Sequence, residues 1–578
     1  MTSSLRPALL ALCCTVSACH AQPGEQGTAT PPDAGLVGKG RTSIGLVLAE
    51  NGQLPIDERI ALYHRLKKER FEEHTFQQET DLTMYGYSLL WGGKPSEALA
   101  VFQLLASEFP GSSNAYDCIG EAFLVLGDTV LAVANYEKAL ELDPNNLSSM
   151  GQLDRIQGKQ SVAENYADRY AKVFTVQQYR ADLDELGSKL MELHPNALKF
   201  ISEKGLRELI ERKKALITDS TTYAQFNWHC CEIVASIKCS HTSTGDFFLE
   251  NQLVPAAKRF PLRTHFVDGH LYITDSVVQD SRFAVGDEIQ RINGVLVKDL
   301  VQEIYRHIPA QGNNETSKRY DLNTWSTVMI PFALDHPDHF ELHIAGKEPL
   351  RLKPLTKPIP IETSVHSACP DKLCFQVLPN KTTALLTITS FSYYWWSNLP
   401  EFKTFIDSSY QEIEAQGITD LIIDVRYNGG GSQHASIHLL KYLMHQPFRY
   451  FSSALYDEEE GIQEPFKNAY GGKLYFMIDG NGNSTTGHFM SLVKAHDLGV
   501  IVGEELGSNQ FCTGGSTTCR LTHTQLEFYV ATGTHITTAT GLPDETGILP
   551  DHTIPQTIDT YLKGEDPVRD FTLGLIAE

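Results

Sequence analysis

Residues 421–431 have the sequence LIIDVRYNGGG, and the architecture of the chain is inferred outward from this segment. Residues 421–425 are apolar except for Asp424, and they have the length typical of a buried strand. Three glycines follow, and glycine accepts backbone conformations that other residues avoid, so the segment predicts a strand that ends in a tight turn with exposed amide groups. The turn lacks the Gly-Lys-Ser/Thr ending of a phosphate-binding loop. We therefore expect it to bind an oxyanion.

Strands and helices alternate on both sides of this segment. Residues 384–389 and 473–478 are also predicted to be buried strands, and an amphipathic helix is predicted over residues 399–415. This alternation predicts an α/β core over residues 376–565. Catalytic groups of such a core lie where its parallel strands end.

Ser484 stands at such a strand end and begins a predicted helix that runs to about His496. A serine at the start of a helix usually caps it. The same position suits a nucleophile, because the helix dipole and the free amide of Thr485 face an oxygen that becomes negative when a carbonyl is attacked. The local sequence leaves both interpretations open.

Taken in order, four motifs resemble those of the tail-specific, carboxyl-terminal-processing serine peptidases. They are residues 423–431, Ser484, residues 500–504 and residues 547–551. The family's serine lies nineteen residues before the glycine that corresponds to Gly503, and this spacing leads to Ser484. The resemblance covers about residues 186–565. It implies a crotonase-like core, a ββα spiral, that hydrolyses peptide bonds in protein or peptide substrates without a cofactor.

The family has two kinds of catalytic base. One branch uses a lysine about 25 residues after the serine, where this chain has Asn509. The other, similar to tricorn protease, uses a histidine from the helical segment before a PDZ-like insert, and Ser240-His241 matches that pattern. The resemblance therefore implies His241 as the general base and Ser240 as the residue that orients its ring.

The remaining site residues also follow from this resemblance. In the histidine branch a carboxylate acts through the serine beside the base, and both Asp544 and Glu545 are candidates for it. The tetrahedral oxyanion is expected to rest on the amides of Gly430 and Thr485.

Residues 56–175 contain a repeat with a period of 34 residues. Five positions recur in register: Gly86, Gly93, Ala98, Phe102 and Pro110 match Gly120, Gly127, Ala132, Tyr136 and Pro144. The pattern resembles the tetratricopeptide repeat, a helix-turn-helix unit. We expect either a platform for a protein partner or a spacer that packs on the enzyme.

Between the repeats and the core, residues 176–248 are predicted to be helical and residues 249–356 to be rich in strands. The string GDEIQRING at residues 286–294 resembles the PDZ domain, which captures extended peptides by strand addition. No clear carboxylate-binding loop is visible, so a degenerate PDZ-like module is expected.

The N-terminus has the pattern of an export signal. Residues 1–19 combine Arg6 with an apolar run and end in a sequence that resembles the bacterial lipobox, which implies lipidation of Cys19. Cleavage after Ala21 without lipidation is the alternative. Residues 20–55 are predicted to be a linker. These features predict an exported protein, in the periplasm or as a cell-envelope lipoprotein of a bacterium, with membrane contact only through a lipid anchor.

Composition limits the classes of function. The net charge of −23 over 578 residues argues against a nucleic-acid partner, and the length predicts a multidomain protein. Two close cysteine pairs, Cys369 with Cys374 and Cys512 with Cys519, could form disulfides in an oxidising compartment. Two alternatives to a peptidase remain: a non-catalytic scaffold on a peptidase-like core, and a hydrolase of esters or non-peptide amides.

Overall fold

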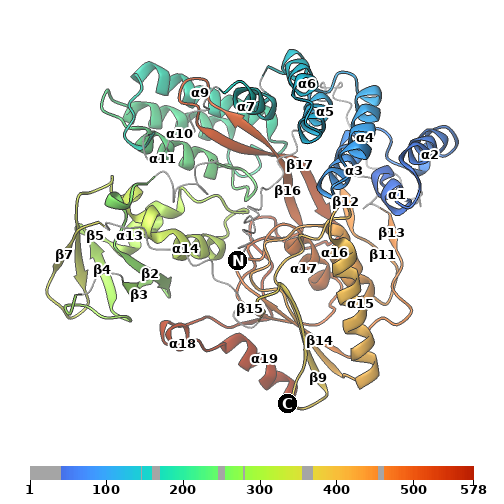
Figure 1. The fold of residues 1–578 in the computed structure, drawn as a ribbon. Coiled ribbons are helices and arrows are strands. Elements are labelled where there is room, and N and C mark those ends of the chain that lie inside the picture. Colours follow the sequence, from blue (N-terminus) through green and yellow to red (C-terminus); the bar gives the residue numbers. More distant parts are fainter. Residues whose placement is uncertain are drawn as a thin grey trace, which may run out of the picture.

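The structure is a computed structural model that describes residues 41–144, 146–158, 169–244, 254–276, 280–354, 369–453 and 461–578. The predicted signal peptide, Cys19 and most of the predicted linker lie outside the described residues. Figure 1 shows a helical N-terminal part, a β-rich part and a mixed α/β core.

Helical hairpins form the repeat region. The helices are α2 (Ile56–Glu69), α3 (Glu79–Trp91), α4 (Pro95–Glu108), α5 (Ser113–Val125), α6 (Thr129–Leu142) and α7 (Leu147–Ile156). A Cβ atom at Gly86 would lie 2.2 Å from the Phe102 ring, and one at Gly120 would lie 2.7 Å from the Tyr136 ring. Small residues thus let paired helices approach at both repeat positions. Assignment to the tetratricopeptide class remains a prediction.

The predicted linker is too long. Helix α1 (Ile44–Glu50) lies within it, and its N-cap Ser43 donates to Asp81 at 2.8 Å. A Cβ atom at Gly45 would lie 2.5 Å from the ring of Trp395 in the core. The helix is held by these tertiary contacts, which the composition of the segment does not reveal.

The predicted helical segment and the β-rich insert share one hydrophobic core. The helices are α9 (Val176–Leu193), α10 (Glu203–Leu216) and α11 (Tyr223–Ala235). The insert has an antiparallel sheet of β2 (Leu262–Val267), β3 (His270–Ser276), β4 (Glu288–Ile292), β5 (Val295–Leu296), β6 (Phe340–Ile344) and β7 (Leu350–Leu352), with helices α13 (Val297–Tyr305) and α14 (Glu315–Ala333). Trp228 of α11 stacks on His307 with ring centroids 3.7 Å apart. Both parts contribute to one cluster of buried residues, and the PDZ-like class of the insert remains a prediction.

A six-stranded sheet forms the centre of the core. Its order is β18 (His552–Thr553), β15 (Val500–Gly503), β14 (Lys473–Ile478), β10 (Asp420–Asp424), β9 (Thr383–Ile388) and β8 (Leu373–Val377). The pairings from β18 to β9 are parallel, and β8 is antiparallel to β9.

Helices cover both faces of this sheet (Figure 1). One face packs on α15 (Leu399–Gln416), α16 (Gln433–Leu443) and α17 (Thr485–Ala495). The other packs on α19 (Pro567–Ala577), which α18 (Ile558–Lys563) precedes. The α/β core expected from the sequence is therefore present, whereas its crotonase-like topology remains a prediction.

A long hairpin connects the core to the helical segment. Strands β16 (Phe511–Arg520) and β17 (Glu527–Thr537) pair antiparallel, and β17 also pairs with β1 (Ser243–Thr244) and β12 (Phe451–Ser453). A small pair, β11 (Phe448–Arg449) with β13 (Ile462–Gln463), lies nearby in sequence. The hairpin tip is held by Asp182 of α9, which accepts from the amides of His523 and Thr524 at 3.0 and 2.7 Å.

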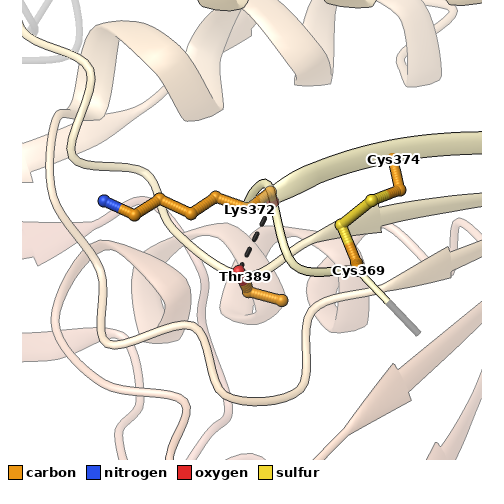
Figure 2. The surroundings of a disulfide bond; sticks show 4 residues. All are labelled: Cys369, Lys372, Cys374 and Thr389. Carbon is orange, nitrogen blue, oxygen red and sulfur yellow. Dashed lines mark hydrogen bonds between the residues drawn. A yellow bond between two sulfur atoms is a disulfide. The ribbon is translucent and has the colours of Figure 1, made fainter. Parts of the chain in front are cut away.

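One of the two predicted cysteine pairs is bonded. Cys369 and Cys374 form a disulfide beside the turn in which Thr389 donates to the carbonyl of Lys372 (Figure 2). The prediction of a disulfide between Cys512 and Cys519 is wrong. Both cysteines are free, and they lie seven positions apart along strand β16. The glycines between them form strand rather than a turn.

Candidate active site

Ser484 lies in a strained turn between β14 and α17. Its φ of +53° and ψ of −124° fall in a region that residues other than glycine rarely adopt. Although it occupies the N-cap position of α17, its hydroxyl makes no capping hydrogen bond. The capping interpretation is therefore wrong, and the hydroxyl is available to another partner.

The glycine turn after β10 packs directly on Ser484. A Cβ atom at Gly430 would lie 2.7 Å from the Ser484 Cβ, and one at Gly431 would lie 2.2 Å from the carbonyl carbon of Phe391. Both glycines have positive φ, +97° and +140°. Thr485 adds a further link, because its Oγ1 donates to the carbonyl of Gly431 at 2.6 Å. Only glycine at positions 430 and 431 allows the backbone to lie this close to its neighbours, Ser484 and Phe391.

The two amides predicted to hold an oxyanion flank Ser484 but differ in their partners. Thr485 is the first helical residue of α17, where an amide has no intrahelical acceptor. The Gly430 amide instead donates to Oδ1 of Asn428 at 3.0 Å. The Thr485 amide is therefore ready for an oxyanion, whereas that of Gly430 would have to exchange its partner.

Strand β1 brings His241 to this turn. Thr242, just before β1, accepts at 3.0 Å from the amide of Ala531 in β17. Nδ1 of His241 lies 3.2 Å from Oγ of Ser240, and that hydroxyl donates to Oδ1 of Asn483 at 3.0 Å. This bond joins Ser240 to Asn483, which are 243 positions apart in the sequence. It places the candidate base, His241, beside the residue that precedes Ser484.

Cys512 of β16 contacts both the candidate base and the candidate nucleophile. Its Sγ lies 3.6 Å from Nδ1 and 4.0 Å from Nε2 of His241, and the Ser484 side chain is near enough to the thiol to lower its pKa. Among the described contacts there is no direct hydrogen bond between Ser484 and His241. Burial raises the pKa of the Cys512 thiol, which is therefore protonated at neutral pH and a poor nucleophile. Sequence reasoning missed this position because no local motif marks it.

Two further histidines, His488 of α17 and His535 of β17, lie near His241. Burial lowers the pKa of His241 to about 4, and burial followed by the charge of His241 lowers the pKa of His535 to about 4. Both ring nitrogens of His488 are buried without a hydrogen-bond partner in the described structure. The imidazoles are therefore neutral at pH 7. The sequence analysis did not single out His488. Its position one helical turn after Ser484 was the only indication in the sequence that it lies near the candidate site.

The structure brings neither candidate carboxylate to Ser240. Asp544 accepts from Gln510 at 2.6 Å and pairs with Lys199 at 2.6 Å. Glu545 is exposed, and its backbone carbonyl accepts from the amide of Asn313. In the described structure, the acceptor of the Ser240 hydroxyl is Asn483 instead.

Asn509, which stands at the lysine position of the other branch, has a structural role. Its Nδ2 donates to the carbonyls of Asp544 at 3.0 Å and Thr546 at 2.6 Å, and its Oδ1 accepts from the Phe511 amide at 2.9 Å. The side chain therefore fastens the loop that carries the two carboxylates.

The described segments contain no group of three or more His, Cys, Asp or Glu side chains arranged to hold a metal ion. No helix within the same segments is long and apolar enough to cross a membrane.

Comparison with known proteins places the site within a peptidase region. Residues 382–554, under a third of the chain, match the model of Peptidase family S41. This segment includes Ser484, the glycine turn and the parallel strands that carry them, and the match supports a peptidase core. No curated protein sequence matches the chain.

Several solved structures resemble the chain at low identity. Mature CPAF complexed with lactacystin is 12% identical, with a TM-score of 0.47 over 67% of this chain and 97% of that one. Photosystem II D1 C-terminal processing protease is 13% identical, with a TM-score of 0.33 over 68% and 98%. The tricorn protease is 15% identical, with a TM-score of 0.31 over 69% of this chain and 36% of that one. At these identities and TM-scores, the resemblance does not indicate the chemistry of this chain.

Proposed function

We propose that the chain is a serine endopeptidase that cleaves proteins or peptides through an acyl-enzyme, with Ser484 as the nucleophile and His241 as the base. The observation that carries the proposal is the Ser484 turn. A strained serine that does not cap its helix packs on a turn that only glycine can form, within the region that matches Peptidase family S41.

The chemistry begins with proton transfer from Ser484 to Nε2 of His241 as the hydroxyl attacks a peptide carbonyl. Both groups lie next to Cys512, so a shift of the Ser484 side chain must complete the hydrogen bond between Ser484 and His241. Such bonds are often long without substrate and shorten in the Michaelis complex.

The tetrahedral oxyanion is stabilised first by the Thr485 amide, at the positive end of α17. The Gly430 amide joins when it exchanges Asn428 for the oxyanion. His241 then gives its proton to the leaving amine, and water releases the acyl group in the reverse sense.

Export is a further part of the proposal. The Cys369–Cys374 disulfide favours it, because disulfides persist in oxidising compartments. Membrane contact through lipidated Cys19 and a partner on the repeat region remain proposals that rest on sequence alone.

The test compares the purified protein with its Ser484→Ala variant. The variant is expected to lose both cleavage of an unfolded protein and labelling by a fluorophosphonate, while its circular dichroism and melting temperature stay unchanged. Ser516→Ala is the matched control, because Ser516 is a half-buried serine of the neighbouring strand β16. Equal cleavage by the Ser484→Ala variant would refute the assignment.

The same experiment separates the alternatives. Hydrolysis of simple esters without cleavage of any protein or peptide would favour an esterase or amidase. Neither turnover nor labelling in the unmodified protein would favour a non-catalytic scaffold, a role that Asn509 at the lysine position permits.

A further inference from the structure

The side chain of Asn483 links the candidate base to the backbone of the nucleophile turn. Its Oδ1 accepts from Oγ of Ser240 at 3.0 Å, and that oxygen lies 3.2 Å from Nδ1 of His241. Asn483 is bonded covalently to Ser484 through the backbone. Its side chain reaches His241 through the hydrogen bond with Ser240.

The backbone of Asn483 is fixed independently of this contact. Its amide donates to the carbonyl of Asn428 at 3.2 Å, and its carbonyl accepts from the amide of Thr486 at 3.0 Å. A Cβ atom at Gly430 would lie 2.7 Å from that same carbonyl. The side chain therefore projects from a rigid turn, and its loss need not disturb the turn itself.

The positions of the hydrogens follow from the number of donors. A serine hydroxyl has one hydrogen, and an amide Oδ1 can only accept. When Ser240 gives its hydrogen to Asn483, its Oγ can only accept from His241, so Nδ1 must carry the ring proton. Nε2 is then the unprotonated nitrogen, which is the state that a general base needs.

We propose that Asn483 is a positioning residue, which acts through Ser240 to hold His241 in the tautomer that can accept the Ser484 proton. It takes the place that the sequence analysis gave to a carboxylate at Asp544 or Glu545. This inference rests on the proposed function of the same site.

A neutral acceptor in place of a carboxylate has an electrostatic consequence. A carboxylate near the ring would stabilise the imidazolium and raise the pKa of His241, whereas an amide does not. The titratable groups that face His241 come from its own segment and from α17, β16, β17 and the end of α9: Cys239, His488, Cys512, His535 and His194. No carboxylate is among these described groups, so an introduced one should have a visible effect.

The experiment compares Asn483→Ala, Asn483→Asp and the control Asn481→Ala in the full chain, with kcat and KM measured across pH. Asn481 lies in the same turn, and only its backbone amide has a described hydrogen bond, which alanine keeps.

Asn483→Ala frees the Ser240 hydrogen to bond Nδ1, which permits the unproductive tautomer. We expect kcat to fall about 10- to 100-fold with little change in KM, which is less than the ~10²–10⁴-fold that general-base catalysis supplies in all. Asn481→Ala should match the unmodified protein.

Asn483→Asp keeps an acceptor for Ser240 and adds a negative charge. We expect kcat near neutral pH to stay within about threefold of the unmodified protein, because aspartate can only accept. The acidic limb of its pH profile should move to higher pH, because the carboxylate favours the imidazolium. A residue with a purely structural role would not produce this rescue and shift.

Three results would overturn the inference: unchanged kcat in Asn483→Ala, equal losses in Asn483→Ala and Asn483→Asp, or a loss in Asn483→Ala that follows a lower melting temperature. These three results can be told apart from failure of the proposed function. If the proposed function fails, the unmodified protein itself shows no turnover that depends on Ser484. That outcome refutes both the function and the role of Asn483.

Discussion

Two polar clusters lie near the carboxyl ends of neighbouring strands in the core, and they are built in opposite ways. Beyond β10, Arg426 bonds Asp424 at 2.9 Å through Nε and through Nη2, and it bonds Asp566 at 2.7 Å through Nη1 and through Nη2. Beyond β14, the described groups that contact His241 are neutral at pH 7, and they lie 3.2 to 4.0 Å from its ring nitrogens.

The difference separates a cluster of ion pairs from the candidate active site. In the Arg426 cluster one guanidinium bridges the carboxylates of Asp424 and Asp566, so its role is to fix where β10 ends and the glycine turn begins. The Ser484 cluster contains a strained backbone, an imidazole without partners and no carboxylate in its described contacts. Buried polar groups that lack partners cost stability, and such groups beside a strained serine agree with the proposed function.

The largest expected effect is on activity. His241→Ala should lower kcat/KM by about 10²- to 10⁴-fold, because it removes the proposed general base. The melting temperature should change little. His445→Ala, at an exposed loop histidine, is the control, and equal activity in the two variants would contradict the role of His241.

The next effect is on stability. Arg426→Met should reduce the free energy of unfolding in urea by about 3–5 kcal/mol, because it removes the guanidinium that pairs with the buried Asp424 carboxylate. Arg282→Met breaks an ion pair at the surface, with Asp280, and should leave the urea midpoint unchanged. A similar midpoint for the two variants would mean that the two ion pairs contribute alike.

The dependence of activity on pH tests the neutral character of the Ser484 cluster. Burial lowers the pKa of His241 to about 4, so the unprotonated base persists as the pH falls. We expect kcat/KM to be nearly constant between about pH 7 and pH 5 and to fall about tenfold per pH unit below pH 4. A fall of kcat/KM with its midpoint near pH 6.5 would show that the imidazole of His241 is exposed or stabilised by a charge.

The smallest effect is expected at Cys512. Cys512→Ala removes the thiol between Ser484 and His241 and should cost about 1 kcal/mol of unfolding free energy. Turnover should stay within about tenfold, because the protonated thiol takes no part in the reaction. Loss of turnover comparable to that in His241→Ala would assign the thiol a chemical role.

The sequence predicts the parts of this molecule that depend on local pattern. The strand and glycine turn at residues 421–431, the strand before Ser484 and the helix after it all follow from apolar runs and glycine chemistry. The match of residues 382–554 to Peptidase family S41 agrees with the resemblance that pointed to Ser484.

Contacts between distant segments account for what the sequence did not predict. Nothing near Ser240 indicates that its hydroxyl bonds Asn483, and nothing near Cys512 indicates that the thiol lies beside His241. Asp544 has a suitable position in the chain, yet Lys199 and Gln510 occupy its oxygens. Periodicity records which face of an element is buried, whereas these contacts depend on how whole elements pack together.

The packing of α1 bears on how the protein can be divided. Gly45 lies against Trp395, and Trp395 belongs to the loop whose Phe391 forms a bridge with Gly431 of the glycine turn. A truncated chain that begins at residue 176 would lose the cover of this tryptophan and expose more of its indole. The helices before residue 176 therefore pack on the core through Trp395, and expression of the core alone would have to replace this contact.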